Sequence, residues 1–156
     1  MSSAGFAAGI AVGVAFVVAF SIMPFPYGDR GQYEDVTITL ERTVCFGFCP
    51  DYVVTIHGNG TVVYEGRAFV AVEGTQTAQI PEQDVQELVS EFYRAGFFSL
   101  ADRYEQAVTD LPSQTTSITI DGMTKSVYRY GSEPQRLAML EDRIDEIAGT
   151  EKWVKE

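Results

Sequence analysis

The chain has 156 residues, which suits one domain with a short additional element. Its 22 Asp and Glu residues outnumber its 11 Lys and Arg residues, so the formal net charge at pH 7 is −11. Nucleic acids and anionic membrane surfaces attract clustered positive charge, so this excess of acid argues against binding to either.

The first part of the chain is an uncharged, apolar segment. No charged side chain precedes Asp29, and Ser21 is the one clearly polar side chain within 4–24. A helix over 4–24 would be about 31 Å long, close to the roughly 30 Å of a bilayer core. A signal peptide cleaved after Ser21 is the alternative, but signal peptides begin with positive charge and have a shorter apolar region. We therefore predict an uncleaved transmembrane anchor over 1–25 that contacts the lipid bilayer through 4–24.

Small residues recur within this segment. Gly5, Gly9 and Gly13 follow one another at intervals of four, a spacing that lets transmembrane helices approach closely. The stripe predicts a homo-oligomer, although Gly is also common in membrane helices that remain single. Residues 26–32 include Pro and Gly and are predicted to be a linker, so we expect the folded domain over 33–156.

The chain's two cysteines, Cys45 and Cys49, lie in one short segment. Gly47 and Pro50 disfavour a helix there, and a tight turn would bring the two Cα atoms within the roughly 4.4–6.8 Å that a disulfide requires. The alternatives are a structural disulfide or two unreactive thiols, a redox pair and a metal site, and we predict that Cys45 and Cys49 are bonded to each other. The C-x-x-x-C spacing differs from that of redox dithiols, and His57, the one histidine, would leave zinc without a fourth ligand.

The candidate interaction loop consists of Phe46, Gly47, Phe48 and Pro50. If the cysteines are bonded, the two aromatic side chains are held in a rigid ring and lose little entropy when they contact a partner. The alternative is that both aromatic rings turn inward and cover the core.

Alternating apolar residues predict a strand before this loop and a hairpin after it. The hairpin joins 52–56 to 61–64, and a three-residue loop with Gly60 left-handed places Ile56 opposite Val62. The buried face of the first strand contains Val36, Ile38 and Leu40.

Two polar residues of the hairpin have other potential roles. His57 is predicted to point away from the apolar face, where a single histidine indicates no particular function. Asn59 begins an Asn-Gly-Thr sequence, a possible glycosylation site, but its preference for left-handed turns is a sufficient alternative explanation.

Residues 67–80 are predicted to form one further extended stretch, followed by a helix. The helix is expected to start at Pro81, a favoured first position, and to end at Gly96 in a left-handed cap. Its predicted buried stripe contains Val85, Leu88, Val89 and Phe92.

Residues 98–113 are predicted to form a loop with three acids, Asp102, Glu105 and Asp110. Paired carboxylates perform acid–base catalysis when they are buried and close together, which makes a hydrolase our weakest functional hypothesis. The alternative is a solvated acidic loop.

A second hairpin is expected from 115 to 130 through Asp121-Gly122, followed by a second helix. Ser132 and Gln135 have the spacing of a capping box, and Gly149 is expected to end this helix. The order strand, hairpin, strand, helix, hairpin, helix predicts an α+β fold, an antiparallel sheet built from hairpins with two helices packed on one face.

The stretch from about 36 to 154 resembles the DUF6438 family. The resemblance rests on Cys-x-Gly-x-Cys-Pro-x-Tyr, from Cys45 to Tyr52, and on Thr109-Asp110-Leu111-Pro112. The family has no assigned activity, so the resemblance implies no catalytic residue. It implies that the cysteine loop and the 109–112 turn are family features, and we expect them to be neighbours in space.

We expect a membrane-anchored binding or structural module on the extracytoplasmic side, because paired cysteines suit an oxidising compartment. The alternative function is thiol–disulfide exchange by Cys45 and Cys49. Neither a cofactor nor a metal ion is expected, and the sequence does not identify the protein partner.

Overall fold

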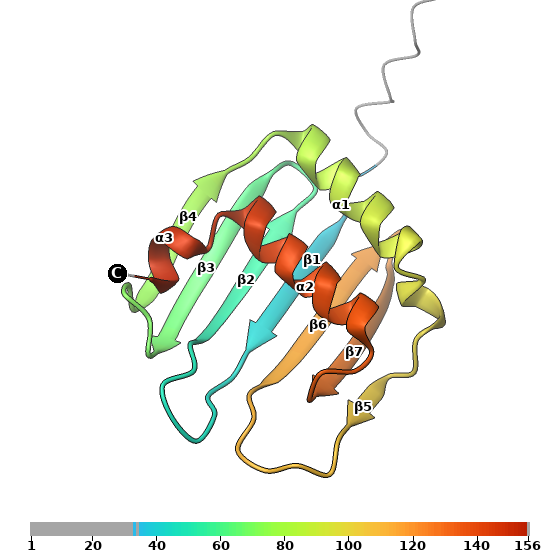
Figure 1. Cartoon of the computed structure of the whole chain (residues 1–156). Helices are drawn as coiled ribbons and strands as arrows, with labels where there is room; N and C mark the ends of the chain where they lie inside the picture. Colours follow the sequence, from blue (N-terminus) through green and yellow to red (C-terminus); the bar gives the residue numbers. More distant parts are fainter. Residues whose placement is uncertain (1–32, 34, 156) are drawn as a thin grey trace, which may run out of the picture.

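The computed structural model describes residue 33 and residues 35–155 of the chain (Figure 1). The predicted anchor over 1–25, the stripe of Gly5, Gly9 and Gly13 and the predicted linker lie outside the described residues. Among the residues that are described, no helix has the length and apolar character needed to cross a bilayer.

The domain has an α+β fold in which the helices lie on one face of a seven-stranded sheet (Figure 1). The strand order across the sheet is β4-β3-β2-β1-β6-β7-β5. The strands are β1 Thr37–Arg42, β2 Asp51–His57, β3 Thr61–Ala68, β4 Gly74–Gln79, β5 Arg103–Glu105, β6 Ser113–Ile120 and β7 Met123–Tyr130. The helices are α1 Glu82–Arg94, α2 Gln135–Ala148 and α3 Glu151–Val154, with a short 3-10 helix, η1, at Phe97–Ser99.

The turns of both predicted hairpins are confirmed. Ile56 pairs with Val62 across the β2–β3 turn, and Gly60 has the left-handed φ of 81° that a three-residue loop requires. In the second hairpin Asp121 and Gly122 both have positive φ, as a two-residue type I′ turn requires.

The sheet differs from the predicted one in two places. Residues 67–80 do not form one extended stretch, because β3 continues to Ala68 and the chain turns at 69–73 before β4 begins. Within the predicted loop, residues 103–105 form β5, which pairs with β7 in parallel. The sheet is therefore mixed and not purely antiparallel. Three residues are too few to show an alternation of apolar and polar side chains, so no periodicity marks β5 in the sequence.

The helices bury the predicted stripes. In α1 these are Val85, Leu88, Val89 and Phe92. Gly96 after α1 and Gly149 after α2 both adopt left-handed conformations, as predicted. The predicted capping box is wrong, because α2 begins after Pro134 without a side-chain cap, and Ser132 instead accepts a hydrogen bond from the side chain of Gln106 at 3.4 Å.

The C-terminal segment returns to the core and fixes the turn between β3 and β4. The ring of Trp153 in α3 stacks on Tyr64 with centroids 4.9 Å apart, and the Trp153 carbonyl accepts a hydrogen bond from the Val72 amide at 2.9 Å. Gly66 permits this turn to approach closely, because a Cβ atom there would lie 2.1 Å from the Val72 carbonyl oxygen.

Candidate functional site

The disulfide is present, and it closes the loop between β1 and β2. Cys45 and Cys49 are bonded, with their Cα atoms 5.4 Å apart. Gly47 has a φ of 153°, which side chains disfavour, and its amide donates to the Cys45 carbonyl at 2.9 Å. Pro50 leads directly into β2. The described elements therefore place no helix start beside either cysteine, in contrast to the catalytic dithiols of redox proteins.

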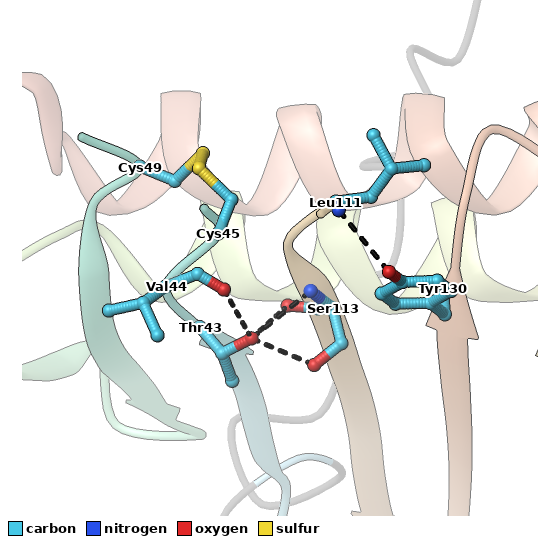
Figure 2. The surroundings of a disulfide bond; sticks show 7 residues. All are labelled: Thr43, Val44, Cys45, Cys49, Leu111, Ser113 and Tyr130. Carbon is cyan, nitrogen blue, oxygen red and sulfur yellow. Dashed lines mark hydrogen bonds between the residues drawn. A yellow bond between two sulfur atoms is a disulfide. The ribbon is translucent and has the colours of Figure 1, made fainter. Parts of the chain in front are cut away.

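The disulfide loop lies beside the 109–112 turn at one end of the sheet, as the resemblance implied (Figure 2). Because β1 and β6 are antiparallel neighbours, the end of β1 adjoins the start of β6. The hydroxyl oxygens of Thr43 and Ser113 are 2.8 Å apart, and the Thr43 amide donates to the Ser113 carbonyl at 3.0 Å. In the second loop, the Leu111 amide donates to the Tyr130 hydroxyl at 3.2 Å. Both loops are thus held by the sheet.

Phe46 and Phe48 project from the disulfide loop into solvent. Each side chain is 88 % exposed, so neither covers the core. The Phe48 ring contacts the ring of Phe69 edge to face, with centroids 5.6 Å apart, and Phe69 is itself 47 % exposed. We refer to Phe46, Phe48 and Phe69 as the aromatic surface.

Phe69 reaches this surface through an uncommon backbone conformation. Its φ is 55°, in the left-handed region, which costs a bulky residue about 1–3 kcal/mol. The turn is held in place because the Ala71 amide donates to the Val154 carbonyl at 3.3 Å, next to the bond between Val72 and Trp153. A shallow groove of ≈ 440 Å³ lies between the turn, the disulfide loop and α3, lined by Phe48, Phe69, Val70, Ala71 and Val154.

A second cavity, of ≈ 460 Å³, lies against Pro50 and also includes Val154 in its lining. It is organised by the carboxylate of Asp145 in α2. This carboxylate accepts hydrogen bonds from the Tyr52 hydroxyl at 2.8 Å, from the Thr150 hydroxyl at 2.9 Å and from Nε of Arg42 at 2.8 Å. Tyr52 is the last residue of the cysteine motif, so the network joins that motif to α2.

The same network sets the ionisation of two of its members. Burial by itself would lower the pKa of Arg42, but the charge and hydrogen bond of Asp145 act together with Tyr52 and Glu141 to outweigh burial, and the pKa is raised. Burial raises the pKa of Tyr52, and the negative charge of Asp145 raises it further. Neither group changes its charge near neutral pH, so neither is suited to acid–base catalysis there.

Arg42 belongs to a row of polar side chains on the helix-covered face of the sheet. Strand pairing places the row on four adjacent strands, in the order Tyr52, Arg42, Gln114 and Arg129. Arg129 is 7 % exposed and bonds to Glu141 of α2, which is fully buried and also accepts a hydrogen bond from Thr116 at 3.2 Å. Two helix carboxylates, Asp145 and Glu141, thus neutralise two arginines at this end of the core.

The polar row is not among the features predicted from the sequence, although the sequence contains a signal for it. Arg42 is in phase with the buried residues Ile38 and Leu40, and Arg129 is in phase with Val127. A charged residue in phase with a buried strand face needs a partner of opposite charge. The acids that fulfil this need lie about 12 residues away for Arg129 and 103 residues away for Arg42, beyond the reach of local patterns.

His57 and Asn59 lie at the β2–β3 turn, at the opposite end of the sheet from the disulfide loop (Figure 1). The side-chain oxygen of Asn59 accepts a hydrogen bond from the Thr61 amide at 3.0 Å, and its carbonyl oxygen accepts one from Nε2 of Gln79 at 2.7 Å. Asn59 therefore stabilises the turn. It is exposed, and its glycosylation stays a prediction.

The three acids of the 98–113 segment do not form a shared site. Asp102 pairs with Lys125, Glu105 pairs with Arg103, and Asp110 accepts a hydrogen bond from the neighbouring threonine hydroxyl at 3.0 Å. The hydrogen bond from Arg103 lowers the pKa of Glu105. All three acids are exposed, so the burial that the hydrolase hypothesis required is missing. Among the described residues, no group of three His, Cys, Asp or Glu side chains is arranged to hold a metal ion.

The comparisons with known proteins identify the family of the domain. The model of a domain of unknown function, DUF6438, matches residues 36–148. No curated protein matches the chain. The matched range extends from the residue before β1 to the end of α2, and it includes the disulfide loop, the 109–112 turn and the polar row. The chain therefore belongs to the DUF6438 family.

Proposed function

We propose that this protein is a binding module whose aromatic surface, Phe46, Phe48 and Phe69, docks on a protein partner. The observation that carries the proposal is the exposure of Phe46 and Phe48, each 88 %, at the tip of a loop that a disulfide closes. Folding alone gives no reason to hold two large apolar side chains in water, and clustered exposed apolar surface is typical of interaction sites.

The rigidity of the loop favours binding. Each aromatic side chain that a partner covers contributes about 1.5–3 kcal/mol through the area removed from water. The disulfide already restricts the loop, so less conformational entropy is lost when the complex forms. Phe69 is fixed by its turn, and the groove beside it offers room for an apolar side chain of the partner.

The charges around the aromatic surface select the partner's chemistry. The cavity next to the groove is lined by the exposed acids Asp142, Glu146 and Glu151. With Asp145 the lining holds four acids against two cations, Arg42 and Lys155, so an excess of negative charge remains there. The chain as a whole has a net charge of −11. We therefore infer a protein partner that presents apolar side chains flanked by Lys or Arg.

The proposal includes a location. We infer that residues 4–24 form a single-pass anchor and that the domain lies on the extracytoplasmic side of the membrane. The length and apolar character of this segment support the anchor, and the disulfide supports an oxidising compartment. N-terminal sequencing of the mature protein tests the anchor, and a mature chain that starts at Ile22 would contradict it.

The experiment for the binding surface uses a photo-crosslinking amino acid at Val44, which is 45 % exposed beside the disulfide loop. Full-length protein in its native membranes is compared with the double variant Phe46→Ser, Phe48→Ser. The matched control is Met123→Ser, Met139→Ser, which alters apolar side chains that are 71 % and 66 % exposed elsewhere.

We expect one crosslinked protein band in the wild type and in the methionine control, and its loss in the phenylalanine variant. Thermal unfolding verifies that all three proteins are folded. A band that persists without Phe46 and Phe48 would refute the binding surface, as would crosslinks to lipid in place of protein.

A further inference from the structure

The two edges of the sheet are built differently. Edge strands of native proteins are protected from pairing by shortness, charge, Pro or a bulge. β5 has such protection, because it has three residues and carries Arg103 and Glu105. β4, at the other edge, has six residues, Gly74–Gln79, with no charge and no Pro, and its pairing with β3 is regular throughout. Among the described strands, β4 is thus the edge open to a further strand.

The backbone groups that β4 presents outward follow from its pairing with β3. The Ile80 amide donates to the Gly60 carbonyl at 2.9 Å, so the backbone groups of every second residue before Ile80 also point toward β3. The alternate residues, Thr75, Thr77 and Gln79, therefore direct their amides and carbonyls away from the sheet. β4 is the last strand in the order of the sheet, so no described strand lies on its outer side to accept hydrogen bonds from these amides.

We propose that β4 pairs antiparallel with β4 of a second copy of this chain, about a two-fold axis at Thr77. Thr77 then faces its own counterpart, and Thr75 faces Gln79 of the other copy. Each outward residue completes both of its backbone hydrogen bonds, about six bonds in total. The three outward positions are self-complementary because they are symmetric about Thr77, as a two-fold interface requires.

Charge favours a second copy as the occupant of this edge. The domain is strongly acidic, yet residues 74–81 contain no charged side chain, so two copies meet there without repulsion across the strands. The same edge offers no acid to a basic peptide. Gly74 leaves the end of the strand open, because a Cβ atom there would meet no atom within 4 Å. The contact of Thr77 with its counterpart is a favourable cross-strand pair.

This pairing adds a property to the proposed binding module. One continuous sheet would carry two aromatic surfaces, each at the disulfide end of its own copy. A partner with two matching sites would then bind both surfaces, and the second contact would form within the complex at a high effective concentration. The inference itself does not depend on the proposed function, because it rests on β4 alone.

Cysteine crosslinking of the full-length protein in membranes tests the register. In the proposed dimer the two Cα atoms at position 77 are about 5.5 Å apart, within the range for a disulfide. Thr77→Cys should therefore crosslink to itself under mild oxidation. Thr75→Cys is the matched control on the same strand, and it should crosslink to Gln79→Cys in a second copy but at least about tenfold less to itself, because its own counterpart is about 13 Å away.

A charge at the axis provides a second test with the same readout. Adding Thr77→Lys should lower the yield of crosslinks between Thr75→Cys and Gln79→Cys at least about tenfold, because two like charges then oppose each other. Thr124→Lys, an exposed position on β7, should leave the yield unchanged. Mass spectrometry separates these crosslinks from exchange with Cys45 and Cys49, and thermal unfolding verifies the fold. Equal crosslinking at 75 and 77, no crosslinking at 77, or insensitivity to Thr77→Lys would overturn the proposal.

Discussion

Arg42 and Asp145 join the sheet to α2: Nε of Arg42 donates to Oδ2 of Asp145 at 2.8 Å, across 103 positions of sequence. Arg42 ends β1 just before the disulfide loop, and Tyr52, which bonds to the same carboxylate, follows that loop at the start of β2. The hydroxyl of Thr150, just before α3, also donates a hydrogen bond to the Asp145 carboxylate. The two ends of the disulfide loop are therefore fixed to one helix carboxylate.

The first prediction concerns this carboxylate. Asp145→Asn should lower the free energy of unfolding by about 2–4 kcal/mol, because Arg42, whose side chain is 18 % exposed, then keeps only the exposed carboxylate of Asp142 as a charged partner. Chemical denaturation of the full-length protein in mild detergent measures the change. Asp142→Asn is the matched control, since Asp142 also contacts Arg42, at 3.2 Å, but its side chain is 79 % exposed. Asp142→Asn should lower the free energy of unfolding by less than about 1 kcal/mol. Equal losses in the two variants would contradict the central position of Asp145.

The second prediction concerns alkaline pH. Tyrosine in an unfolded chain has a pKa of about 10, and burial and the charge of Asp145 raise the pKa of Tyr52 above this value. Above about pH 10 the folded protein therefore retains a proton that the unfolded chain releases, so the free energy of unfolding falls as the pH rises. Below that pH this contribution is fully present.

Tyr52→Phe tests this pH dependence. The free energy of unfolding of the variant should be about 1 kcal/mol lower at neutral pH, because one hydrogen bond to Asp145 is removed. Above pH 10 this free energy should fall less steeply with pH than in the wild type. Some decline should remain, because burial also raises the pKa of Tyr64. Unfolding curves at a series of pH values measure both effects. If the free energy of unfolding falls as steeply in the variant as in the wild type, Tyr52 is not responsible for the loss of stability at alkaline pH.

The sequence predicts those parts of the fold that depend on local patterns. Alternation in β2 and β3 gives the register in which Ile56 pairs with Val62, and Gly96 and Gly149 mark the ends of the two long helices. β5 is not predictable in this way, because its parallel pairing with β7 depends on the chain already having been folded over by the rest of the sheet.

In the candidate site, too, the features set by local sequence are predictable and those set by tertiary structure are not. The disulfide loop is visible in the sequence, because its residue types and spacing are local. Phe69 is not recognisable as part of the aromatic surface, because a φ of 55° contradicts the backbone preference of a bulky residue. The conformation is held by hydrogen bonds that amides of the turn donate to carbonyls of α3. The pairing of Arg42 with Asp145 is likewise set by tertiary structure alone.

The third prediction concerns the buried pair of Arg129 and Glu141. Glu141→Leu should lower the free energy of unfolding by about 3–5 kcal/mol, because it leaves Arg129 buried and unpaired. The double variant Arg129→Leu, Glu141→Leu should recover a large part of this loss, since it removes both charges together. Chemical denaturation of the wild type, both single variants and the double variant gives the coupling energy. Additive losses would mean that the two side chains do not interact energetically.

The fourth prediction separates the stability of the disulfide loop from its function. Cys45 and Cys49 are only four positions apart, so their bond restricts the unfolded chain little, and Cys45→Ser, Cys49→Ser should cost about 2 kcal/mol with the fold intact. The network of Arg42, Tyr52 and Asp145 still fixes the two ends of the loop. Without the bond, however, the tip that carries Phe46 and Phe48 becomes mobile, and crosslinking to the partner from position 44 should fall strongly.

The double variant Phe46→Ser, Phe48→Ser should lose the crosslink completely but keep its stability. Its free energy of unfolding should change by no more than about 0.5 kcal/mol, because both side chains are exposed. Thermal unfolding and the crosslinking assay, applied to both variants, measure these two effects. If the cysteine variant keeps full crosslinking, the disulfide does not preorganise the aromatic surface, and if it unfolds, the bond supports the whole domain and not the loop alone.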